Sequence, residues 1–275
     1  MYIKKTYQFK NSIEVEKMYS ARFGKKGMKH NAKTNPSPEA MKKHNRKKCA
    51  DNLRRLIKLN FQSGWHMTLT YRKDDRPDRA LAKRYVNNFL RRMKYWLSKE
   101  GVELKYILVT EYENKAIHHH IIINDSPNLI KLVGKQWPHG QANFTLLYVD
   151  DDVATLAEYL IKETDKTFRE DPDCKLRYTC SRNLEKPEPR VEIIKANEFR
   201  KEPKIPRGYI LEADSLVNGV SSATGYEYQS YRLTKIPEKG KRNERQKKPL
   251  RGHDSGEVSV LPQKGKTKNC MRRSL

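Results

Sequence analysis

The sequence lacks the features that mark membrane, secreted or disulfide-stabilised proteins. No apolar run reaches the length of about 18 residues that a membrane-spanning helix needs. The opening stretch, MYIKKTYQFK, has no apolar core of a secretion signal. The four cysteines (Cys49, Cys174, Cys180 and Cys270) are scattered and form no CxxC pair, which disfavours a disulfide framework or a zinc site. We therefore expect a cytoplasmic protein with no membrane partner.

Negative charge is scarce at both ends of the chain. The 275 residues include 58 Lys or Arg and 33 Asp or Glu, a net charge of +25. Residues 1–60 carry a net +13 and residues 239–275 a net +9, whereas the residues between them carry only +3. Basic flanks around a nearly neutral body suit a polyanion. Nucleic acid is preferred over an acidic membrane surface, because neither flank has the amphipathic pattern of a lipid-bound helix.

The composition predicts three parts. Residues 1–60 form a basic arm and helix that contact DNA, residues 61–238 form the folded domain, and residues 239–275 form a basic disordered tail. Within the first part, residues 1–35 show no steady hydrophobic period and are expected to be flexible.

Hydrophobic periodicity predicts an α+β fold with a mostly antiparallel sheet and helices on one face. Ser37 and Asp78 are expected to cap two helices, and Gly101 to end the second. Residues after 170 are expected to form short strands and loops that continue the domain. The expected strands are 66–71, 103–112, 117–123 and 143–149, and a third helix is expected at 150–166.

The stretch AIHHHIIIN, residues 116–124, combines three histidines with three isoleucines. Alternate residues of a strand face opposite sides, so His118 and His120 share one face, about 6–7 Å apart, and the isoleucines beside them can face the core. His119 falls on the apolar side and is expected at the edge of the core or hydrogen-bonded. Two histidines joined by Glu111 from the preceding strand would give a three-ligand metal site with open positions. Glu113 is the alternative carboxylate, because sequence does not fix the register.

The segment LAEYLIK, residues 156–162, places Tyr159 beside Lys162 on the flank of the third helix. Taken by itself, this pair fits a tyrosine that packs by its ring and a lysine that is solvated or pairs with Glu158.

Taken together, the three segments resemble the HUH endonucleases that initiate rolling-circle replication, over roughly residues 60–235. The motifs that match are the strand MTLTY, His118-His119-His120, and Tyr159-Leu160-Ile161-Lys162. His119 departs from the pattern, in which an apolar residue is usual. The resemblance implies an RRM-like core and, since this helix has one tyrosine, the one-tyrosine type of initiator from a plasmid, phage or integrative element.

The resemblance also implies a mechanism. Tyr159 would cut single-stranded or hairpin origin DNA, form a 5′-phosphotyrosine link, free a 3′-OH primer and later rejoin ends. Mg²⁺ or Mn²⁺ on Glu111, His118 and His120 would polarise the phosphate, and Lys162 would ease phenolate formation or hold the phosphate. No helicase motor is recognised in the sequence, so a host helicase and polymerase are the expected partners.

Basic residues of the first part and two near the site are the expected DNA contacts. They are Lys42, Lys43, Arg46, Lys47, Lys48, Arg54 and Arg55, with Arg177 and Arg182 closer to the site. The alternatives are a transposase or conjugative relaxase of the same chemistry, and a non-catalytic DNA-binding protein.

Overall fold

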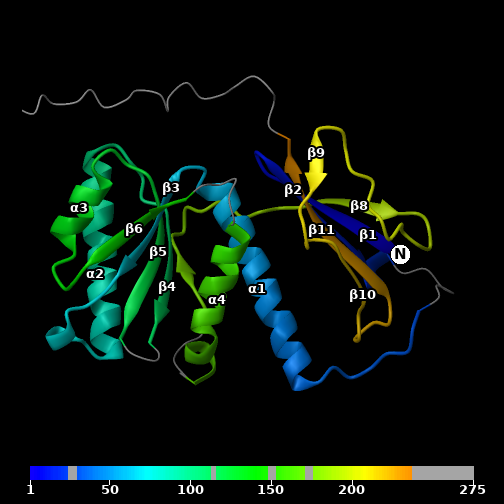
Figure 1. Cartoon of the computed structure of the whole chain (residues 1–275), viewed down its shortest axis with the longest axis horizontal. Coiled ribbons are helices and arrows are strands. Elements are labelled where there is room, and N and C mark those ends of the chain that lie inside the picture. The colour runs from blue at the N-terminus through cyan, green and yellow to red at the C-terminus, as the bar shows by residue number, and fades with distance from the viewer. Residues whose placement is uncertain (24–29, 113–115, 148–152, 171–175, 237–275) are drawn as a thin grey trace, which may run out of the picture. The chain divides into compact units, whose positions relative to one another are not determined.

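Two antiparallel sheets and four α-helices make up the part of the chain that the computed structural model describes, residues 1–23, 30–112, 116–147, 153–170 and 176–236 (Figure 1). The strands are β1 (Tyr2–Gln8), β2 (Ser12–Tyr19), β3 (Gly64–Leu69), β4 (Tyr106–Glu111), β5 (His118–Asn124), β6 (Ala142–Leu146), β7 (Thr179–Cys180), β8 (Arg190–Ile194), β9 (Tyr209–Leu211), β10 (Val217–Val220) and β11 (Glu227–Lys235). The helices are α1 (Pro38–Asn60), α2 (Arg79–Lys99), α3 (Leu129–Gln136) and α4 (Val153–Glu170), with short 3-10 helices at Ala21–Phe23 and Lys73–Asp75.

The central sheet has the strand order β6-β3-β5-β4-β7. Helices α2 and α3 cover one face, where Met67 and Ile121 join their apolar side chains. Helices α1 and α4 cover the other face, where Ile107, Val109 and Ile122 are buried with them. The predicted α+β class with a mostly antiparallel sheet is confirmed. The helices lie on both faces rather than one, because β4 and β5 present apolar residues in both directions.

The helix ends follow the capping residues. The Ser37 side chain accepts a hydrogen bond from the backbone N–H of Ala40, and Asp78 accepts one from Leu81, so both predicted N-caps are confirmed. Gly101, just after α2, has a φ of 72°, a left-handed conformation that glycine adopts without strain. No helix in the described part of the chain is both long and apolar enough to cross a membrane.

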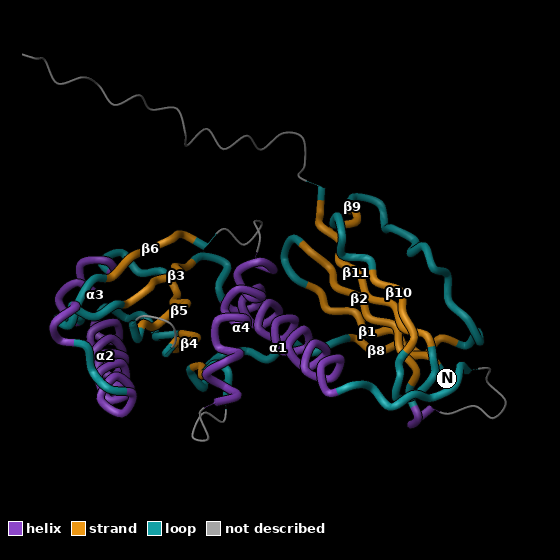
Figure 2. Tube along the Cα trace, turned by 60° about the horizontal axis from the view of Figure 1, so that its bottom comes forward, coloured by secondary structure: helices purple, strands orange, loops and turns teal. Residues whose placement is uncertain are grey.

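The second sheet, which we call the terminal sheet, pairs the two ends of the described chain (Figure 2). Its order is β10-β11-β2-β1-β8, with β9 also paired to β11. The prediction of a flexible arm at residues 1–35 is therefore wrong for β1 and β2, and β8 to β11 do not extend the central sheet as expected. Their partners are remote in sequence: Lys17 pairs with Gln229.

A buried ion-pair group, which we call the Glu14 cluster, joins α1 to the terminal sheet. Glu14 is 1% exposed and binds Arg54 through two hydrogen bonds of 2.8 Å. Arg55 donates to the same carboxylate at 2.8 Å, and the Nζ of Lys58 lies 3.5 Å from it. Burial by itself would raise the pKa of Glu14, but the bond to Arg54 and the charges of Arg54, Lys58 and Arg55 lower it to about 2. The opposite side of α1, with Leu53 and Ile57, is buried among residues of α4 and the central sheet.

Several expectations fall on residues outside the described part. They are the turn at 113–115 with Glu113, the end of the strand expected at 143–149, the start of the helix expected at 150–166, and the tail at 239–275.

Candidate active site

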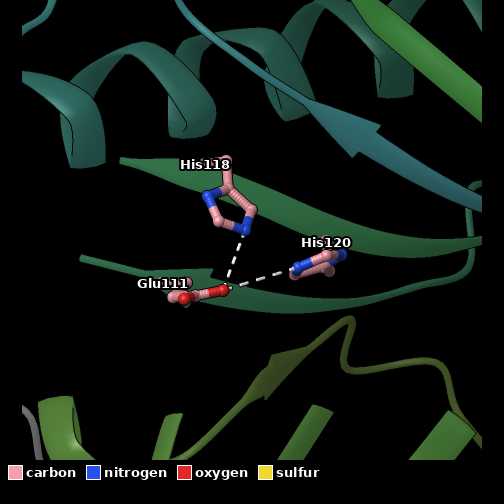
Figure 3. Close-up of side chains that lie close together, drawn as sticks. All are labelled: Glu111, His118 and His120. Atoms are coloured by element: carbon pink, nitrogen blue, oxygen red, sulfur yellow. Dashed lines mark ion pairs between the residues drawn. The ribbon is translucent and has the colours of Figure 1, made fainter. Parts of the chain in front are cut away.

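The hairpin of β4 and β5 places Glu111, His118 and His120 on one face of the central sheet. Antiparallel pairing sets Glu111 opposite His118 and Val109 opposite His120, so the three polar side chains point the same way. The Oε2 of Glu111 lies 2.8 Å from the Nε2 of His118 and 3.9 Å from the Nε2 of His120 (Figure 3). The ligand atoms all lie within 4.8 Å of one another, close enough to hold one metal ion. The prediction that these residues meet is confirmed, and their role as ligands stays a prediction.

His120 shows that a cation would fit here. Its Nε2 is buried and has no hydrogen-bond partner among the described residues, although it points toward the Glu111 carboxylate. Burial, with the nearby charges of His66, His118 and His119, lowers the pKa of His120 to about 3, so its ring is neutral at physiological pH. A neutral imidazole with a free ring nitrogen is the form that binds a metal.

His119 lies on the opposite face and takes no part in this cluster. It is fully buried, 2.8 Å from the Tyr71 hydroxyl through Nε2 and 2.9 Å from the Thr110 hydroxyl through Nδ1. Burial and the charge of His118 lower its pKa to about 3. The expectation that His119 is hydrogen-bonded is confirmed, and its neutral ring fastens β5 to β3 and β4.

Helix α4 brings Tyr159 to the metal-binding face. Its neighbours Leu160 and Ile161 are buried, while Tyr159 is 41% exposed. The ring of Tyr159 meets the His120 ring edge-on, with centroids 5.6 Å apart. Lys162 is exposed one turn further along α4. The phenol is therefore open to solvent and adjacent to the histidine cluster.

Glu163 belongs to the same site and was not predicted. Burial raises the pKa of Glu111; the charge of His118 opposes this, while the charge of Glu163 and a hydrogen bond to it add to the rise. Glu163 lies four residues after Tyr159, so both side chains project from one side of α4. Burial raises the pKa of Tyr159 as well, and the charges of Glu163 and Glu111 raise it further. The phenol thus carries its proton at neutral pH when no cation is bound. The spacing of four residues is the signal that would have indicated Glu163.

The predicted DNA contacts divide into two groups. Lys42, Lys43, Arg46, Lys47 and Lys48 are all exposed on the N-terminal half of α1, and Arg182 is exposed after β7. Arg54 and Arg55 are instead buried in the Glu14 cluster, with 3% and 5% exposure. Their guanidinium groups are held by carboxylates and shielded from solvent, so the prediction that they grip DNA phosphates is wrong. Arg177 is mostly buried and pairs with Asp165 at 2.6 Å.

Helix α2 is a second basic element that the sequence interpretation overlooked. Its 21 residues include no Asp or Glu. Two aromatic side chains near its end, Tyr95 and Trp96, are 55% and 45% exposed. The basic residues of α2 are Arg79, Lys83, Arg84, Arg91, Arg92, Lys94 and Lys99. Positive charge beside exposed rings is typical of single-strand nucleic-acid surfaces.

Comparison with known proteins connects the site to replication. Residues 64–168 match the model of a family of replication-associated proteins, described under the name ORF2. The matched stretch runs from β3 into α4 and includes Glu111, His118, His120 and Tyr159. No curated protein and no solved structure matches the chain. The region that holds the candidate site is therefore similar to replication-associated proteins, a family whose role implies DNA binding.

Proposed function

We propose that the chain is a replication initiation endonuclease of the HUH type, which nicks single-stranded origin DNA through Tyr159. The observation that carries this proposal is the position of the Tyr159 ring, 5.6 Å from the His120 ring and 41% exposed. A DNA phosphate that enters from solvent can reach the phenol and the Glu111, His118 and His120 cluster at once. The family match over residues 64–168 supports the replication role.

The proposed chemistry exchanges one phosphate ester for another. The Tyr159 oxygen attacks the scissile phosphorus, the bond from phosphorus to the 3′ oxygen breaks, and the 5′ end stays on the tyrosine. The phenol loses one proton and the departing 3′ oxygen gains one, so the step is balanced. Because the ester is conserved, the reverse reaction can rejoin ends. The freed 3′-OH suits extension by a host polymerase after a host helicase separates the strands.

The surroundings of Tyr159 show why the phenol needs assistance. Burial and the carboxylates Glu163 and Glu111 raise its pKa, which opposes formation of the attacking phenolate. Mg²⁺ or Mn²⁺ held by Glu111, His118 and His120 would supply positive charge beside the phosphate. Lys162, exposed on the same helix, either offsets the phenolate charge or holds the phosphate.

Covalent capture of DNA tests the proposal. The purified protein with Mn²⁺ is mixed with 5′- and 3′-labelled single-stranded oligonucleotides that tile the element carrying its gene. We expect one oligonucleotide to be cut, with the downstream fragment attached to the protein by its 5′ end. Peptide mapping of that adduct should identify Tyr159. Binding without cleavage on every oligonucleotide supports a non-catalytic DNA-binding protein, and cutting at transposon ends or a transfer origin supports a transposase or relaxase.

Loss of one ligand should remove metal binding. We expect His118→Ala and Glu111→Ala to weaken Mn²⁺ binding by about 100-fold or more, since changes to residues that merely support metal ligands already cost about 10–100-fold. Isothermal titration calorimetry measures the affinity. His44→Ala, an exposed histidine on α1, is the matched control and should bind Mn²⁺ as the unaltered protein does. Equal Mn²⁺ affinity in the His118 variant and the control would exclude these residues as ligands.

The exposed half of α1 should determine the salt dependence of DNA binding. The variant replaces Lys42, Lys43, Arg46, Lys47 and Lys48 with glutamine. If all five contact phosphates, the unaltered protein loses about two to three decades of affinity between 50 and 200 mM salt, and the variant loses most of that dependence. Fluorescence anisotropy at several salt concentrations gives the slope. The control removes five exposed charges elsewhere, from Lys195, Arg200, Lys201, Lys204 and Arg207. An equal change of slope in both proteins would refute a specific role for α1.

A further inference from the structure

His66 lies against the metal-facing histidine but has no role in the proposed chemistry so far. It is on β3, and the pairing of Thr68 with His120 and of His66 with Ile122 puts all these side chains on the metal-binding face. The Nε2 of His66 is 3.1 Å from the Nδ1 of His120. The two rings stack with centroids 5.3 Å apart and planes 23° from parallel.

The position of one proton decides whether His120 can bind a cation. A neutral imidazole has one N–H, so a free Nε2 lone pair requires the proton on Nδ1. That N–H then needs an acceptor, because the ring is 4% exposed and a buried unpaired donor costs about 1–3 kcal/mol. The structure offers two acceptors at Nδ1, the Nε2 of His66 at 3.1 Å and the Oγ1 of Thr68 at 3.2 Å.

We infer that His66 is a positioning residue, whose Nε2 accepts the Nδ1–H of His120 and keeps the Nε2 of His120 free for the cation. The inference rests on the metal site of the proposed function. His66 does more than Thr68, because its stacked ring also sets the direction of the His120 ring. The Thr68 hydroxyl rotates, so it can donate or accept and does not select one tautomer. Metal-bound histidines commonly hold their second ring nitrogen in this way.

Three variants separate the acceptor from the ring. His66→Phe keeps an aromatic ring and removes the acceptor. His66→Gln removes the ring and offers an amide oxygen near the place of Nε2. His139→Phe is the matched control, since this half-buried histidine stacks on Tyr85 with ring centroids 3.9 Å apart and does not contact the cluster. Calorimetric titration of the full chain with Mn²⁺ alone gives each affinity, and thermal unfolding in EDTA gives the metal-free stability of each variant.

We expect His66→Phe to weaken Mn²⁺ binding by about 10–100-fold and His66→Gln to recover most of that loss. The control should bind as the unaltered protein does, and the unfolding temperatures in EDTA should stay close together. In the Mg²⁺-loaded protein, ¹⁵N NMR should show the His120 proton on Nδ1. Unchanged affinity in His66→Phe overturns the inference while the metal site stands. A loss that tracks metal-free stability and is not rescued by glutamine also overturns it. If the unaltered protein binds no Mn²⁺, the metal site of the proposed function fails and the inference fails with it.

Discussion

Replacing Tyr159 with phenylalanine is expected to abolish DNA cleavage and leave DNA binding intact. The change removes only the hydroxyl, and the ring can keep its edge-on contact with His120. Removing a nucleophile that acts with its neighbours as a unit costs on the order of 10⁴-fold or more in rate. Cleavage of a labelled single-stranded oligonucleotide in Mn²⁺ measures the rate, and a denaturing gel shows whether any covalent adduct forms.

The matched control for this prediction is Tyr95→Phe. Tyr95 is also an exposed helical tyrosine, but it lies on α2, which covers the other face of the central sheet. The control should cut at the normal rate. A Tyr159→Phe protein that still forms an adduct would assign the nucleophile to another side chain. Normal cleavage in both variants would contradict the proposed chemistry at α4.

The second large effect concerns stability. Glu14→Gln leaves Arg54, Arg55 and Lys58 buried beside a neutral amide. Breaking a buried ion pair by removing one partner costs about 3–5 kcal/mol, because the remaining charge is left uncompensated. We expect the free energy of unfolding in urea to fall by this amount. Glu192→Gln is the control, since Glu192 makes an exposed ion pair with Lys4 in the same sheet. Exposed pairs contribute about 0–1 kcal/mol, so a similar loss in both variants would contradict the role of the Glu14 cluster.

The Glu14 cluster also predicts how stability depends on pH. The pKa of Glu14 is about 2 in the folded protein, against 4.5 for an unperturbed glutamate. A lowered pKa means that the unfolded chain binds the proton more tightly. The stabilisation is therefore complete above about pH 4.5 and is lost as pH falls toward 2. The difference corresponds to about 3 kcal/mol. Glu14→Gln should lack this part of the acid transition, as urea unfolding at several pH values will show.

The elements around the site could be predicted because their signals are local. Asp78 caps α2 a few residues from the bond it makes, and MTLTY alternates within one strand. The terminal sheet was missed, since lysines interrupt the apolar pattern of β1 and β2. The strand that pairs with Lys17 also lies 212 residues away. Helix α3 was missed as well, because its eight residues are too few for a clear helical period.

The candidate site was predictable in part for the same reason. A hairpin fixes which residues of its two strands face each other, so Glu111, His118 and His120 followed from one short segment. His66 and Glu163 lie on other elements, and their approach depends on how β3 and α4 pack. Arg54 is similar: its charge is visible in the sequence, but its partner is 40 residues earlier in a strand that was not expected.

The pairing of β2 with β11 has a consequence for how the protein is made. β2 leaves the ribosome early, whereas its partner β11 is among the last described segments to emerge. At about 5–20 residues per second, translation of the stretch between them takes about 10 to 40 s. During that time the nascent β1–β2 hairpin has one open edge. Translation, rather than the folding rate, therefore sets the earliest moment at which that edge is covered.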